Sequence, residues 1–160
     1  MAIVSFNFIR MSADRKAAIR GRLNINNNIT IKDVQEADLS FGKSQEAALR
    51  ITFEFSSTYQ PNAGEILLVG ELIDMTDQTS VKDTVAAWKK DKKVPQQTMA
   101  RILPTILNRC NIQALILSRD INLPPPIPMP RVNVAEAGNG LPQGTLTVNK
   151  KPKDEKSKKK

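Results

Sequence analysis

Hydrophobic and polar residues alternate along three stretches of the first part of the chain, with the period of a β-strand that has one solvated face. These stretches are residues 3–9, 21–32 and 48–55, and the alternation is strongest in the last of them. In the second stretch the apolar residues occupy the odd-numbered positions. Asn27 is the one polar residue among them, which indicates a bulge or a twist. Residues 13–16 are typical of either a turn or a continuation of the first strand.

Residues 65–73 form a fourth stretch, which is apolar on both parities. A strand with this pattern is central in its sheet or has both faces covered. Turn-forming residues precede it at positions 61–64, and no helical pattern separates the four strands, so they predict an antiparallel meander. Because one helical layer covers only one face of a sheet, we expect a partner subunit, in preference to a bound client, on the second face of this strand.

Helical patterns follow the strands. Residues 81–93 are rich in helix formers and include Trp88, and Pro95 suits the first position of a second helix. The apolar residues of that helix recur at helical spacing and are Met99, Ile102, Leu103, Ile106, Leu107 and Cys110. Pro104 lies inside this pattern and is expected to kink the helix or to mark its effective start. The sequence therefore predicts an α+β fold, in which a four-stranded antiparallel sheet is followed by one or two helices packed on one face.

A proline-rich arm, residues 121–130, follows the second helix and holds five prolines. Proline keeps a chain extended with its side chains displayed, so the arm is expected either to border a groove for apolar peptide or to fold back over its own domain. Phe41 and Tyr59 fall in predicted loops beside the third strand, where each is a client contact or a loop anchor. Phe53 and Phe55 are expected in the core beneath the helices. The candidate polypeptide-binding residues are Phe41, Tyr59, Leu123, Ile127 and Met129.

The net charge of +8 is concentrated at the C-terminus. Residues 149–160 hold seven Lys against Asp154 and Glu155, whereas the rest of the chain has 17 basic and 14 acidic residues. A polybasic tail attracts polyanions, chiefly RNA, without reading sequence, and it is equally consistent with a solvated, disordered tail. The candidate nucleic-acid-binding residues are Lys150, Lys151, Lys153, Lys156, Lys158, Lys159 and Lys160.

The sequence does not contain the residues that several kinds of catalytic or metal-binding site require. The chain has no histidine and one cysteine, Cys110, so histidine-based catalysis and a cysteine–histidine zinc site are excluded. The acidic pairs fall in predicted turns, and there is no glycine-rich phosphate loop. We expect no enzyme activity, cofactor or metal. We also expect a soluble, cytoplasmic protein, because neither a signal peptide nor an apolar run of about 20 residues is visible.

The order of these elements resembles the SecB-type protein-export chaperones. The resemblance is carried by Ile-Leu-Pro at 102–104, by Arg109 in the middle of the helix, by Ile-Asn-Leu-Pro-Pro at 121–125, and by the strand at 49–53. It covers about residues 3–130. It implies an ATP-independent chaperone, a holdase without cofactor, that binds unfolded or nascent polypeptides along exposed apolar grooves. Members of the family form dimers that pair into tetramers, so a homo-oligomer is implied here too.

The chain also departs from this family. Typical members are acidic and carry a zinc-binding C-terminal tail that meets the translocase motor, whereas this chain is basic and ends in lysines. The contact with that motor is therefore not carried over, and a role in protein export stays open. We expect a SecB-like α+β domain at residues 1–132, a loop or short edge strand at 133–148 and a disordered lysine-rich tail at 149–160. The alternative function is a ribosome- or RNA-associated protein that uses this tail.

Overall fold

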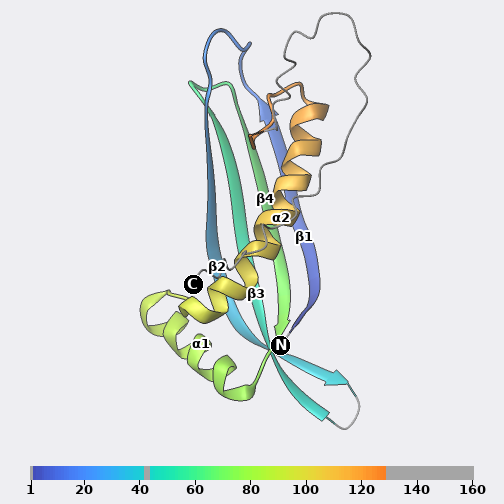
Figure 1. The fold of residues 1–160 in the computed structure, drawn as a ribbon, viewed down its shortest axis with the longest axis vertical. Helices are drawn as coiled ribbons and strands as arrows, with labels where there is room; N and C mark the ends of the chain where they lie inside the picture. The colour runs from blue at the N-terminus through green and yellow to red at the C-terminus, as the bar shows by residue number, and fades with distance from the viewer. Residues whose placement is uncertain (1, 42–43, 129–160) are drawn as a thin grey trace, which may run out of the picture. The chain divides into compact units, whose positions relative to one another are not determined.

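The computed structural model of the chain describes residues 2–41 and 44–128, with the backbone alone at 38–41 and 44–46. These residues belong to one compact unit, Met1–Met129, and the second unit, Pro130–Lys160, lies outside the described residues. Four strands precede two helices (Figure 1), which confirms the predicted α+β fold. The elements are β1 (Ala2–Arg15), β2 (Asn24–Phe41), β3 (Ser44–Gln60), β4 (Gly64–Met75), α1 (Gln78–Asp91) and α2 (Gln96–Asp120).

All strand pairs are antiparallel, and the strand order is β1-β4-β3-β2. Strands β2, β3 and β4 follow one another as a meander, but β1 lies beside β4, where a plain meander would place it beside β2. The two edges are three strand spacings, or about 14 Å, apart. The β1–β2 connection, residues 16–23, can span up to about 27 Å and so reaches across the end of the sheet. Strand β4 is central, as its apolar pattern predicts, and β1 and β2 are the edges.

The two helices cover one face of the sheet, and that face forms the core. Alternate residues of β3 and β4 are fully buried there, including the predicted core residues Phe53 and Phe55. Helix α2 contributes one buried residue per turn, namely Ile102, Ile106, Cys110, Ala114 and Ser118. On the opposite face, the alternate residues of β4 are only half-buried. A partner subunit covering that face stays a prediction.

Helix α1 is fixed at both ends by its caps. The Asp77 carboxylate accepts a hydrogen bond from the Ser80 N–H at 2.8 Å, and this bond holds the pKa of Asp77 below its usual value. Lys92 follows the helix in the left-handed conformation, and its N–H donates to the Trp88 carbonyl. Helix α2 begins one residue after Pro95, so Pro95 is its N-cap and not its first helical residue. Pro104 lies inside α2 and does not mark its start.

Two polar contacts attach α2 to the rest of the fold. Asp74 of β4 has no exposed surface, and both of its carboxylate oxygens accept a hydrogen bond from Nε of Arg101, at 2.9 and 3.3 Å. The buried hydroxyls of Thr84 and Thr98 lie 3.3 Å apart and join α1 to α2. Within residues 2–41 and 44–128, neither helix has the length and apolar character required to cross a membrane.

Candidate functional site

Two neighbouring cavities follow edge strand β2 on the helix-covered side of the sheet. The larger has a volume of about 580 Å³ and the smaller about 290 Å³. Ile29 and Leu103 line both, so the two cavities are adjacent, and we call them together the β2 groove. Its lining residues are Asn27, Asn28, Ile29, Thr30, Ile31, Phe55, Trp88, Lys92, Lys93, Val94, Met99, Leu103 and Leu107.

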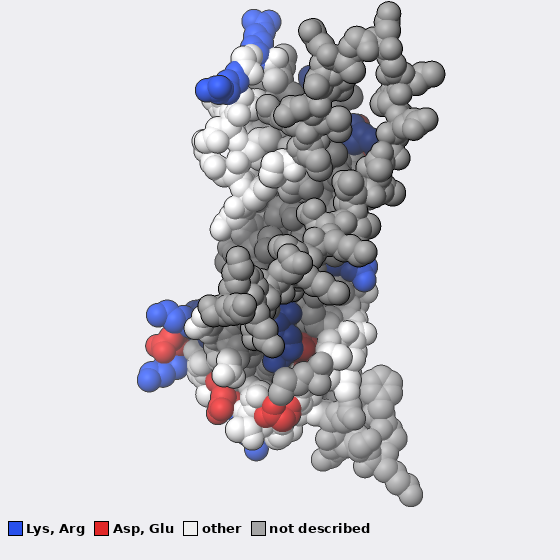
Figure 2. Space-filling view, in the orientation of Figure 1, with Lys and Arg blue, Asp and Glu red and all other residues white. Residues whose placement is uncertain are grey.

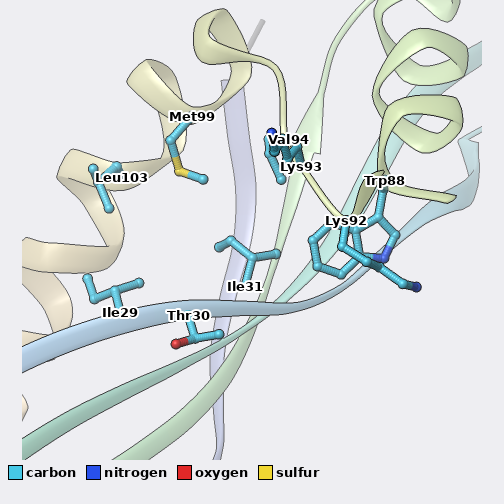
Figure 3. Close-up of a pocket in the computed structure, with 9 residues that line it drawn as sticks. All are labelled: Ile29, Thr30, Ile31, Trp88, Lys92, Lys93, Val94, Met99 and Leu103. Carbon is cyan, nitrogen blue, oxygen red and sulfur yellow. The ribbon is translucent and has the colours of Figure 1, made fainter. Parts of the chain in front are cut away.

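The apolar wall of the groove is built by β2 and α2 facing each other. Ile29 and Ile31 pair with the core residues Phe55 and Phe53, so the two-residue period of the strand directs both isoleucines to the helix side. On α2, Met99, Leu103 and Leu107 recur every four residues, in a row one position along from the buried row of that helix. Figure 3 shows Met99 and Leu103 on one side of the cavity, Ile29 and Ile31 below them, and Trp88 opposite.

The α1–α2 connection borders one end of the groove and contributes both lysines among the residues that line the two cavities. Trp88 is 6% exposed, and its indole N–H has no hydrogen-bond partner within the described part of the chain. The Lys92 ammonium lies 5.2 Å from the centre of the Trp88 ring, within the range of a cation–π contact. Lys92 and Lys93 are exposed, and no acidic residue is among those that line the two cavities. The groove is therefore apolar inside, with a positively charged rim at this end.

The groove also opens onto the free edge of the sheet. Strand β2 ends the strand order, and in the described ranges no backbone hydrogen bond reaches residues 24–31 from the side away from β3. Thr30 lines the larger cavity, although its side chain lies on the face of the sheet opposite to Ile29 and Ile31. A cavity that reaches Thr30 must therefore open at the edge of β2. The stretch from Asn27 to Ile31 spans about 14 Å, which fits four or five residues of an extended chain.

The proline arm is attached to β2 at Asn27, which lines the smaller cavity. Asn27 donates from Nδ2 to the Pro126 carbonyl at 2.8 Å, and its Oδ1 accepts a hydrogen bond from the Ser57 hydroxyl at 2.7 Å. Asn27 is therefore an anchor for the arm. The bulge expected at this residue lies instead between Ile31 and Asp33. The arm is folded back over its own domain as far as residue 128, and its residues Leu123 and Pro125 line, together with α2, a separate cavity of about 470 Å³. A role of the arm beside a groove for apolar peptide therefore stays a prediction.

The residues that the sequence singled out as polypeptide-binding candidates are not part of the groove lining. Tyr59 lies in β3 and is 1% exposed, and Leu123 is 5% exposed. Ile127 is half-buried in the arm. The Phe41 side chain, Met129 and the seven tail lysines lie outside the described residues. The groove itself was not predicted, although the row formed by Met99, Leu103 and Leu107 is visible in the helical spacing of the sequence.

Tyr59 connects the arm to β3, and its removal tests that connection. Burial raises the pKa of Tyr59 to about 12, with a bond from Ser57 acting in the opposite direction, so the neutral hydroxyl donates to the Pro124 carbonyl at 2.8 Å. We expect Tyr59→Phe to lower the free energy of unfolding by about 1 kcal/mol, because the ring stays and one hydrogen bond is lost. Urea unfolding measures this, and an unchanged free energy would contradict it.

The pH dependence of the same variant gives a second measurement. The pKa of Tyr59 is raised from 10.0 to about 12 in the folded protein, so the folded state keeps a proton that the unfolded state loses. The stability that Tyr59 contributes is present below pH 10 and is lost as the pH rises toward 12. Unfolding of wild type and Tyr59→Phe should therefore converge over this interval, and curves that stay parallel would contradict the assignment.

Comparison with known proteins gives the following. A scan against protein-family models and a search of curated protein sequences both return no match. A search of solved structures finds the SecB-like chaperone Rv1957 of Mycobacterium tuberculosis, in complex with a ChAD peptide from the Rv1956 HigA1 antitoxin. The two chains are 13% identical, and their TM-score is 0.47 with 82% of this chain and 89% of that chain covered.

Proposed function

We propose that this protein binds extended apolar segments of other polypeptides in the β2 groove and acts as an ATP-independent holdase. The observation that carries the proposal is the groove between a free strand edge and the apolar row of α2. An extended chain satisfies its backbone hydrogen bonds by adding a strand to such an edge, and its alternate side chains then enter the cavities. A volume of about 580 Å³ at one position accommodates a large apolar side chain.

This arrangement should allow the groove to bind many different peptide sequences and not one specific sequence. Backbone hydrogen bonds at the β2 edge are available to any residue except proline. The flexible side chain of Met99 adapts to apolar groups of different shape, as methionine does at binding surfaces that accept many partners. A folded protein presents few extended apolar segments with unpaired backbone, so the groove should distinguish unfolded chains from folded ones.

The proposal is tested with the intrinsic fluorescence of Trp88, because it is the single tryptophan of the chain and lines the larger cavity. We expect an unlabelled, tryptophan-free apolar peptide of 10–12 residues to shift the Trp88 emission in a saturable manner without nucleotide, and the protein to suppress aggregation of a denatured enzyme. A matched peptide with proline at alternate positions removes the backbone donors and should bind more weakly. Binding without any change at Trp88, or equal binding of both peptides, would refute the groove as the site.

Exposed apolar side chains outside the groove lie on α2 and β1. Ile112 and Ile116 are 54% and 40% exposed on the outward side of α2, and Ile9 and Met11 are 61% and 51% exposed on edge strand β1. These residues are the surface on which the expected homo-oligomer would form, and that assembly stays a prediction. A role in protein export also stays a prediction, as does a contact between the lysine tail and RNA or ribosomes.

A further inference from the structure

The β1–β2 connection carries a cluster of cations at one end of the sheet. Arg15, Lys16, Arg20 and Arg22 are all exposed, and residues 15–23 contain no acidic side chain. On the face that Figure 2 draws, basic side chains lie at the end of the molecule where Figure 1 places this connection. Acidic residues at this end of the sheet are Asp14, the neighbour of Arg15 in the sequence, and Glu65, beside Lys16. We call residues 15–22 the arginine loop.

The loop is attached firmly enough to hold these cations in place. The N–H groups of Lys16 and Ala17 donate to the Ala63 carbonyl at 2.9 and 3.4 Å, which fixes the start of the loop to the β3–β4 turn. Ile19 and Leu23 are half-buried and pack against the core cluster. The loop therefore uses its apolar side chains as anchors and directs its charged ones to solvent.

The guanidinium groups of the loop have no acidic partners within the described part of the chain. Lys16 lies 3.7 Å from Glu65, with both side chains half exposed, but no ion pair involves Arg15, Arg20 or Arg22 there. Three guanidinium groups are thus open to an external anion. The planar donor fork of arginine matches the oxygens of a phosphate group, and a charge-assisted pair of this kind is stronger than a neutral hydrogen bond.

We propose that the arginine loop is a binding site for the phosphate backbone of nucleic acid, separate from the β2 groove. A lipid surface fits less well, because membrane-binding segments insert large apolar side chains and those of this loop are packed inward. An acidic protein fits less well, since a stable protein interface needs about 800 Å² per partner, more than the eight residues of this loop offer. The loop has no aromatic residue for stacking with bases, so its contacts would be made to phosphate groups, which carry no sequence information.

The test measures the salt dependence of binding with the full-length chain, which retains the lysine tail. Fluorescence anisotropy of labelled 20-nucleotide oligo(U) and oligo(dT) is followed between 50 and 300 mM salt. Each neutralised phosphate contributes about 0.7 to the slope of log K against log salt for a single strand. We therefore expect the double variant Arg20→Ala with Arg22→Ala to reduce that slope by about 1.4, equally for both oligonucleotides.

A matched control removes the same charge elsewhere. Lys82→Ala with Lys89→Ala takes two exposed cations from α1 and should leave the slope unchanged. Arg20→Lys with Arg22→Lys keeps the charge and should retain most of the slope. The proposal is overturned if the wild-type chain binds neither oligonucleotide, or if the alanine loop variant and the α1 control have equal slopes, which would assign binding to the tail. Loop-dependent binding to phosphatidylserine vesicles in place of oligonucleotide would overturn it as well.

Discussion

Replacing Arg101 by methionine is expected to lower the free energy of unfolding by about 3–5 kcal/mol, because it leaves the buried Asp74 carboxylate without its counter-ion. Asp74 has no exposed surface and pairs within the sheet with Ile3 on one side and Leu49 on the other. Arg101 reaches it from α2 with Nε 2.9 Å from Oδ2, and a second guanidinium nitrogen contacts the same oxygen. Methionine keeps the unbranched apolar stem and removes the charge.

Urea unfolding measures this loss, with Arg119→Met as the control on the same helix. Arg119 is exposed, and the ion pair of its side chain in the described part of the chain is with its neighbour Asp120 at 3.3 Å, so its replacement should cost less than about 1 kcal/mol. The combination of Asp74→Leu with Arg101→Met replaces the whole pair by apolar groups and should recover most of the stability. If Arg101→Met and Arg119→Met lowered the free energy of unfolding equally, the Asp74–Arg101 pair would have no special structural role.

The hydrophobic periodicity of the sequence predicted the strands and helices. It did not predict the order of the strands in the sheet, which depends on the path of the β1–β2 connection. Alternation at 3–9, 21–32 and 48–55 and the continuous apolar run at 65–73 located all four strands. The strand order did not follow, since a connection of eight residues is long enough either for a hairpin to a neighbouring strand or for the observed crossing of the sheet end. The alternation of β3 also predicts that Tyr59 is buried, because Tyr59 is odd-numbered like the core residues Phe53 and Phe55.

The groove required information that the local pattern does not contain. Ile29 and Ile31 lie on the inward parity of β2 and look like ordinary core positions. They line a groove only because β2 is an edge strand and α2 does not extend over it. Strand order makes β2 an edge, and strand order depends on the path of residues 16–23. The polarity of Asn27 was interpreted as a bulge or a twist, but the bulge lies between Ile31 and Asp33. The side chain of Asn27 instead bonds to Pro126, which is 99 residues away and beyond the reach of any local pattern.

Leu103→Asn is expected to weaken peptide binding about 30-fold while leaving the fold intact. Leu103 lines both cavities of the β2 groove and is half-buried, so an incoming apolar side chain packs against it. Asparagine keeps the branch at Cγ, removes the apolar contact and places an amide where a bound peptide offers no guaranteed partner. A loss of about 2 kcal/mol from these two effects corresponds to that change in affinity.

Ile112→Asn is the matched control, because it makes a comparable apolar-to-amide change on the same helix at an exposed position outside the groove. Peptide affinity of both variants is measured by the Trp88 emission, and urea unfolding checks that both remain folded at the working temperature. We expect Ile112→Asn to bind peptide as wild type does. If the two variants lost affinity to the same extent, the apolar row of α2 would not form the binding surface, and the client would have to contact the outward side of the helix.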